Sequence, residues 1–225
     1  LLLQQLGQED YAILGLYITL QGILLVLEGG LSVTVIERVA TRKISEVNFG
    51  NLKLSYLIVC ITVLLISAIY ARRTLYSWGN TNFVSISWLI ALTLGIRLFS
   101  GFSKAQLFGI SKHNIVFVSA VPLYGLRFLT PILLDLTIAQ VMLVFLFSVL
   151  LELGLYTFFL KKSRNYTAIH SYLPSKDGAY KFASKITLAS LVGTTLVQAD
   201  RLSCSWYYDQ QLFGQFQAIS TFTLG

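Results

Sequence analysis

Long apolar runs separated by short polar breaks make up most of this chain. A helix needs roughly 17 to 25 residues to cross ~30 Å of hydrocarbon. Complete runs of that size occur at 11–36, 52–71, 83–108, 114–134, 138–160 and 184–208. Only 12% of the 225 residues are charged, whereas soluble domains carry roughly 25%. The sequence therefore predicts an all-α, polytopic transmembrane helix bundle and excludes a soluble globular enzyme.

The basic residues gather in alternate loops, which predicts the orientation of the helices. Lysine and arginine accumulate on the cytoplasmic side of a membrane. Arg72 and Arg73 fall on one predicted side. Twelve others fall on the opposite side: Arg38, Arg42, Lys43, Lys53, Lys104, Lys112, Lys161, Lys162, Arg164, Lys176, Lys181 and Lys185. The formal charge of +7 is thus a topology signal, and we expect no nucleic-acid partner because the basic residues are spread over several short loops.

The longest loop divides the chain into three parts. We expect an N-terminal transmembrane lobe at 1–160 with a truncated first helix, a cytoplasmic inter-lobe loop at 161–183, and the truncated start of a second transmembrane lobe at 184–225. The basic loop is either a plain linker or a segment that lies along anionic membrane lipids. The two ends read as parts of helices, so we expect an internal fragment of a longer protein.

The two ends of the chain resemble each other at an offset of 202 residues. At this offset the segment 9–12 falls against 211–214, and 14–20 falls against 216–222. Thr19 and Thr221 are identical, and an aromatic residue recurs at the equivalent positions Tyr11 and Phe213. Internal repeats of this kind are common in transporters, so the offset predicts a second lobe built like the first.

The same residues resemble a known family, the Wzx-type O-antigen and polysaccharide flippases of the multidrug/oligosaccharidyl-lipid/polysaccharide exporter superfamily. In that family the first helix ends in a Leu-Gly-x-Glu-Asp/Glu-Phe-Gly turn, the second runs through Gly-Leu to an arginine, and the second lobe opens with an Asp-Arg pair and a Phe-Gly turn. Ala12 departs from the pattern, since glycine is usual there. The matching residues are Leu6, Gly7, Glu9, Asp10, Tyr11, Gly30, Leu31, Arg38, Asp200, Arg201, Phe213 and Gly214.

This resemblance implies a transporter, not an enzyme, with two six-helix lobes that face each other across a central cavity. Its expected location is the bacterial inner membrane, which it crosses many times. Its expected substrate is a lipid-pyrophosphate-linked oligosaccharide unit, which is flipped for O-antigen or other surface polysaccharide synthesis. The expected partners are this substrate, membrane lipids and a polysaccharide polymerase, and no cofactor is expected.

Ionisable residues inside the predicted spans need a partner or a watery cavity, because each costs about 2.5 to 3.5 kcal/mol on insertion scales. Polar side chains three or four residues apart share one helix face. Four predicted spans carry such a stripe, which predicts a common polar interior. The alternative is that the serines and threonines only bond their own backbone. The stripes are Thr93-Arg97-Ser100-Lys104, Tyr17-Gln21-Glu28, Ser148-Glu152-Tyr156, and Thr187-Ser190-Thr194-Gln198-Arg201-Ser205.

A polyanionic headgroup needs cations in the cavity, and guanidinium matches phosphate oxygens in a forked geometry. Arg97 and Arg201 are therefore the first candidates for substrate binding, followed by Arg127 and Lys104. Arg127 sits nearer the outer end of its span, where its side chain could instead reach the headgroups. Glu28 and Glu152 are the available acidic partners for the arginines. With Asp200, they are also the candidates for ion coupling.

Two other functions stay open. A drug or small-cation antiporter of the same superfamily would use the acidic residues in the cavity. A membrane-embedded glycosyl- or acyltransferase would need clustered acids or a histidine near a membrane surface, and the predicted outer loops are short.

We predict no metal site and no catalytic residue, because the sequence shows no Cys/His cluster, Ser/His/Asp set or phosphate-binding loop.

Overall fold

The structure is a computed structural model that describes residues 2–40, 46–134, 136–164, 192 and 198–223. Within these ranges the regular structure is helical, without a strand. The helices are α1 (Leu2–Ala40), α2 (Glu46–Ser77), α3 (Phe83–Gly109), α4 (His113–Leu134), α5 (Ile138–Arg164) and α7 (Gln210–Thr223), and residues 198–207 are also helical. The predicted all-α bundle is therefore confirmed.

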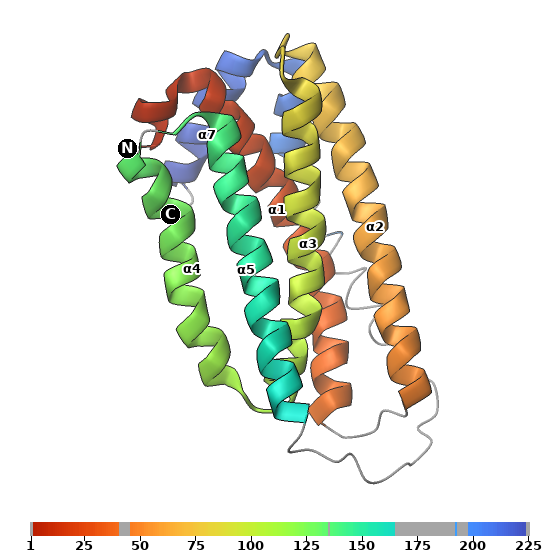
Figure 1. Ribbon diagram of the computed structural model, residues 1–225. Coiled ribbons are helices and arrows are strands. Elements are labelled where there is room, and N and C mark those ends of the chain that lie inside the picture. The colour runs from red at the N-terminus through yellow and green to blue at the C-terminus, as the bar shows by residue number, and fades with distance from the viewer. Residues whose placement is uncertain (1, 41–45, 135, 165–191, 193–197, 224–225) are drawn as a thin grey trace.

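Helix α3 is the centre of the bundle. It packs against α2, α5 and α1, while α4 packs mainly on α5 and α7 packs on α1 (Figure 1). Small residues allow this close packing. A Cβ atom added at Gly109 would lie only 2.6 Å from Cβ of Val39, and one added at Gly95 would lie 3.1 Å from Cδ1 of Leu64. Among the polar residues of α3, Thr93, Ser100 and Ser103 are buried.

Four helices in the described part of the chain are long and apolar enough to cross a membrane: Lys53–Ser77, Phe83–Gly109, His113–Leu134 and Ile138–Ser163. They correspond to four of the six predicted spans, and the protein is a multi-pass membrane protein by this measure. The predicted span 11–36 lies within α1, which is not among the four. Most of the predicted span 184–208 lies outside the described residues, as does the turn at Asp135.

Several predicted loops are shorter than expected. The predicted break at 7–10 is only a kink at Gly7, whose backbone has φ 76°, so Glu9 and Asp10 are helical. Arg72 and Arg73 belong to α2, not to a loop, and α5 continues to Arg164, so the inter-lobe segment begins later than 161. Backbone hydrogen bonding can continue past the hydrocarbon region of the membrane. The length of an apolar run does not show where such a helix ends.

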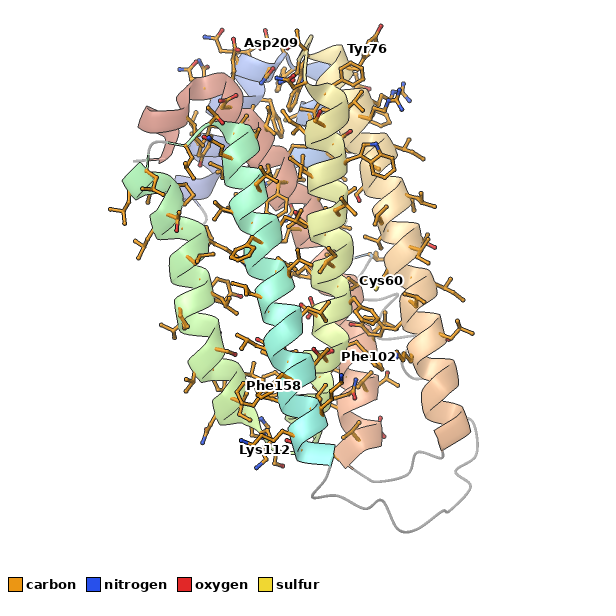
Figure 2. All side chains as sticks on the ribbon, viewed as in Figure 1. Cys60, Tyr76, Phe102, Lys112, Phe158 and Asp209 are labelled. Carbon is orange, nitrogen blue, oxygen red and sulfur yellow. The ribbon has the colours of Figure 1, made fainter. Side chains whose placement is uncertain are left out.

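Two predicted outer turns lie at one end of the bundle, and a predicted inner turn lies at the opposite end. Figure 2 shows Tyr76 and Asp209 at one end and Lys112 at the opposite end. The turns 78–82 and 208–209 lie at the first end, and the turn 110–112 lies at the second. The two predicted outer turns therefore share one end, and which end faces the cytoplasm stays a prediction.

The start of α7 packs on α1 through positions that are equivalent at the offset of 202 residues. The helical breaks at Gly7 and Asp209 are themselves equivalent, and helix resumes at Gln8 and Gln210. Gln210 Nε2 donates to the carbonyl oxygen of Glu9 at 2.8 Å, and Gln211 Nε2 donates to Oε1 of Gln8 at 3.0 Å. Such reciprocal contacts are typical of a two-fold relationship between two copies of a motif.

The segment 198–208 also docks on the end of α2. The Tyr70 hydroxyl lies 2.7 Å from the Ser205 hydroxyl, and the Tyr70 ring stacks on Trp206 with ring centres 5.9 Å apart. Arg73 lies 5.2 Å above the Trp206 ring. Nε1 of Trp78 donates to the carbonyl oxygen of Tyr208 at 3.2 Å. At this end the beginning of the predicted second lobe is thus held against the first.

Candidate functional site

Arg97 on α3 is held by uncharged oxygen atoms of α1. The Gln21 amide is oriented so that its oxygen and its nitrogen each have a hydrogen-bond partner. The Gln21 oxygen then accepts from both terminal guanidinium nitrogens of Arg97 at 3.1 Å. The Gln21 nitrogen then donates to the Tyr17 hydroxyl at 3.2 Å. Tyr17 is 2% exposed and its hydroxyl also interacts with Arg97. The guanidinium is therefore positioned by Gln21 and Tyr17, and it forms no ion pair with a residue that the structure describes.

Arg127 on α4 has a different environment. Its Nη2 is 2.6 Å from Oε2 of Glu152 on α5, and the two side chains are 4% and 15% exposed. Its Nε donates to the Ser148 hydroxyl, one turn before Glu152. The Tyr124 ring lies 5.5 Å from the guanidinium carbon. Arg127 is thus a buried, paired cation, and the alternative that it reaches toward the headgroups is wrong.

Glu28 on α1 lies against the backbone of α3. A Cβ atom added at Gly101 would be 2.5 Å from Oε1 of Glu28, so a larger residue there would make the carboxylate move. Lys104 is the cation that acts most strongly on Glu28, followed by Arg97. Neither forms an ion pair with Glu28, since the pair between Arg127 and Glu152 is the one that the described residues contain.

These groups form one electrostatic cluster on four helices. Arg97 interacts with the charges of Glu152 and Glu28, although its hydrogen bonds go to α1. Glu152 in turn acts on Glu28. Three predicted stripes therefore meet, and the structure brings together five of the predicted site residues: Glu28, Arg97, Lys104, Arg127 and Glu152.

Of the fourth stripe, the structure describes Gln198, Arg201 and Ser205, and Gln198 lies beside Gly22 of α1. Asp200 is exposed and Arg201 is partly buried on the 198–207 helix, and neither forms an ion pair with another described residue. Thr187, Ser190 and Thr194 lie outside the described residues. The candidate roles of Asp200 and Arg201 therefore stay predictions.

Most small hydroxyls in the stripes bond their own helix. Thr93 Oγ1 donates to the carbonyl oxygen of Leu89 at 2.7 Å, and Ser100 Oγ donates to that of Arg97 at 2.8 Å. For these two residues the backbone-bonding alternative is correct. Ser148 differs, because it bonds the Phe145 carbonyl and also accepts from Arg127. The stripe placed Ser148 on the same face as Glu152, but spacing alone does not separate the two kinds of serine.

Comparisons with known proteins add no assignment: no family model, no curated protein and no solved structure matches this chain. The site must therefore be interpreted from its own chemistry. It contains one cation held by neutral groups, one cation paired with an acid, and one acid beside a lysine. Among the described residues, no group of three or more His, Cys, Asp or Glu side chains could hold a metal ion.

Proposed function

We propose that this chain belongs to a flippase that moves a lipid-pyrophosphate-linked oligosaccharide across a bacterial inner membrane for surface polysaccharide synthesis. The observation that carries the proposal is Arg97, a cation deep in an apolar bundle whose guanidinium fork is held by an amide oxygen. Burying a charge without a counter-charge is costly, so such a group needs a functional reason.

An anionic ligand can take the place of the amide oxygen at Arg97. Gln21 presents one neutral oxygen to both terminal nitrogens, and a phosphate oxygen pair would replace it with two charge-assisted hydrogen bonds. These are about twice as strong as neutral ones. Lys104, on the same face of α3, adds a second positive charge for the same ligand.

The other arginines have different roles in this proposal. Arg127 already has Glu152 as its counter-ion. Arg127 therefore affects substrate binding only indirectly, through the electrostatic field of this ion pair near Arg97. Arg201 approaches the substrate from the second lobe, and Asp200 serves ion coupling there. Both assignments rest on the stripe and on the family resemblance.

Transport requires the site to open to each side in turn. The reciprocal contacts of α1 and α7 at equivalent positions support a design with two similar lobes that rock about a shared site. The protein in this proposal moves its substrate without changing it, so it is not an enzyme, and a polysaccharide polymerase is the partner that receives the product.

A small-cation or drug antiporter is the second candidate, and Glu28 favours it. This partly buried carboxylate lies against Gly101 and forms no ion pair with a described residue, which is an arrangement suited to a cationic substrate. The two functions differ in which substitution abolishes transport, since a flippase depends on Arg97 and an antiporter depends on Glu28.

The test is complementation of bacteria that lack their own flippase. Arg97→Ala should abolish surface polysaccharide at normal protein abundance, and Arg97→Lys should restore part of it because lysine keeps the charge but loses the fork. Arg72→Ala is the matched control, since Arg72 is exposed near the end of α2. Normal polysaccharide from a stably expressed Arg97→Ala variant would contradict the proposal.

A further inference from the structure

Arg73 lies in the last turns of α2, at the end of the bundle that Tyr76 and Asp209 mark in Figure 2. Its guanidinium carbon lies 5.2 Å from the centre of the Trp206 ring, on the 198–207 helix. The side chain of Arg73 is exposed and forms no ion pair with a described residue. A guanidinium that rests on an aromatic ring can still donate hydrogen bonds from the edge of its plane. Arg73 can therefore bind an anion without leaving Trp206.

The position of Arg73 along α2 corresponds to the level of the lipid headgroups. The candidate membrane span of α2 is Lys53–Ser77, so Arg73 lies about one helical turn from its end. Tyr76, Trp206 and Tyr207 are large aromatic side chains that are exposed at the same end. Tryptophan and tyrosine are enriched where the hydrocarbon meets the headgroups. The ligand of Arg73 is therefore a group that occurs at this level of the membrane.

An exposed apolar path leads from Arg73 toward the middle of α2. Ile69 and Ile66 precede Arg73 by four and seven residues, so the three side chains share one face of the helix. Ile69 is 69% exposed and Ile66 is 62% exposed. A cation followed by an apolar path matches a phospholipid, in which a phosphate is followed by acyl chains. A free phosphate ion would use the cation alone.

The charges around Arg73 favour a headgroup with a net negative charge. Asp200 and Asp209 are the acids of the neighbouring segment, and neither is within ion-pair distance of Arg73. The guanidinium carbon of Arg72 lies 6.0 Å from the centre of the Phe83 ring of α3. Consecutive helical residues point about 100° apart, so Arg72 does not share the face of Arg73. A positive charge without an acid nearby attracts an anionic headgroup and repels the ammonium of a zwitterionic one.

We propose that Arg73 and Trp206 bind one anionic phospholipid where α2 meets the 198–207 helix. Arg73 holds the phosphate through its guanidinium fork, and an acyl chain lies along Ile69 and Ile66. Arg73 and Trp206 come from distant parts of the sequence, so the bound lipid also stabilises the contact between these two helices. The site does not depend on the proposed function, because it lies at the end of the bundle and does not involve Arg97.

The experiment is photolabelling of the purified protein in detergent with a phosphatidylglycerol that carries a diazirine in one acyl chain. Mass spectrometry then identifies the labelled segments. At 66–69 we expect unlabelled phosphatidylglycerol to compete at a concentration about tenfold lower than phosphatidylcholine with the same chains, as one charge-assisted hydrogen bond allows. The segment 129–133 is the internal reference, because Leu129 and Leu133 are exposed while Arg127, the single basic residue of α4 besides His113, is buried. Both lipids should compete equally there.

Three variants separate Arg73 from its surroundings. Arg73→Gln should abolish the preference for phosphatidylglycerol at 66–69. Arg72→Gln is the matched control, since it removes the same charge from the neighbouring face of α2, and it should keep the preference. Trp206→Leu leaves α2 unchanged and should reduce the preference about two- to fivefold, as expected for the loss of an exposed cation–π contact. Size-exclusion profiles and labelling at 129–133 identify any variant that fails to fold.

Equal competition by the two lipids at 66–69 of the unchanged protein would overturn the proposal. An undiminished preference in Arg73→Gln would also overturn it. Competition by glycerol 3-phosphate as strong as that by phosphatidylglycerol would assign Arg73 to a soluble phosphate and would contradict a lipid site. Arg97→Ala should keep the preference. A flippase proposal that failed at Arg97 would therefore leave this result unchanged, and the two failures are distinguishable.

Discussion

Gly15 and Gln217 occupy equivalent positions at the offset of 202 residues, and they pack directly against each other. A Cβ atom on Gly15 would lie 2.6 Å from Cγ of Gln217. Gln217 also donates to the Thr19 hydroxyl at 3.1 Å. Contact between equivalent residues is expected when a two-fold axis relates the two segments. The structure thus gives the weak sequence repeat a physical meaning, because the two copies form one interface.

The first prediction concerns the closeness of α1 and α7. Gly214→Ala should destabilise the protein by about 1–3 kcal/mol, because its Cβ would collide with the backbone carbonyl oxygen of Gln8. Gly15→Ala should cost less and should be rescued by Gln217→Ala, which removes the flexible side chain that it meets. Thermal unfolding in detergent measures both effects. Gly154→Ala should be neutral or slightly stabilising, since alanine favours helix.

Additive effects of Gly15→Ala and Gln217→Ala would contradict this packing. Two residues in contact should show an interaction energy in a double-mutant cycle, whereas independent sites simply add.

The second prediction concerns the buried ion pair. Glu152→Gln should leave Arg127 without its counter-charge and should cost about 3–5 kcal/mol. Replacing both residues, with Arg127→Met and Glu152→Leu, should recover most of that loss because no buried charge remains. The measurements are protein yield and unfolding temperature. Glu9→Gln, at an exposed acid of α1, is the control. A double variant as unstable as Glu152→Gln alone would contradict the interpretation.

How much could be predicted from the sequence depends on what each level of structure requires. The apolar runs predicted the positions of α2 to α5, because hydrocarbon thickness sets a minimum length for a spanning helix. The helix ends were predicted less well. Arg72 and Arg164 are helical because backbone hydrogen bonding continues into the polar region, and hydropathy carries no information about that.

The polar site shows the same limit. Spacing placed Tyr17 and Gln21 on one face of α1, and Arg97 and Lys104 on one face of α3, which the contacts bear out. It could not show that Arg97 meets Gln21 and not Glu28. That choice depends on the register and rotation of α1 and α3 relative to each other. Close contacts between the two helices, such as Gly109 against Val39, set both. The residue spacing within one helix does not predict these contacts.

The third prediction concerns the orientation in the membrane. Single cysteines at Ser111 and Gln211, in a background without Cys60 and Cys204, should label from opposite sides with an impermeant maleimide. Both positions are exposed, and their turns lie at opposite ends of the bundle (Figure 2). We expect Gln211 to label in intact cells and Ser111 only after permeabilisation. Labelling of Ser111 in intact cells would reverse the topology.

The fourth prediction concerns Asp10, at the predicted outer end of α1. Burial, and then the like charge of Glu9, raises the pKa of Asp10, although a backbone hydrogen bond from Ile138 opposes the shift. The folded state therefore binds this proton more tightly than the unfolded state. Stability falls as pH rises through the two pKa values, and the loss is complete above the pKa of the folded state.

Asp10→Asn should accordingly unfold at a higher temperature than the unchanged protein at neutral pH. The difference should shrink in acid, where Asp10 is protonated in both states. Thermal unfolding over a pH series measures it. A variant that unfolds at a lower temperature at neutral pH would show that the bond from Ile138 outweighs burial.

The most direct test of the central claim is the affinity of the purified protein for a prenyl pyrophosphate. We predict that farnesyl pyrophosphate binds and that farnesol, which has the same chain without the charge, does not compete. Arg97→Ala should weaken pyrophosphate binding about 10- to 100-fold, as expected for charge-assisted hydrogen bonds worth about 1.5–3 kcal/mol. Arg72→Ala should leave the affinity unchanged. Equal affinity of Arg97→Ala and the unchanged protein for farnesyl pyrophosphate would contradict the account.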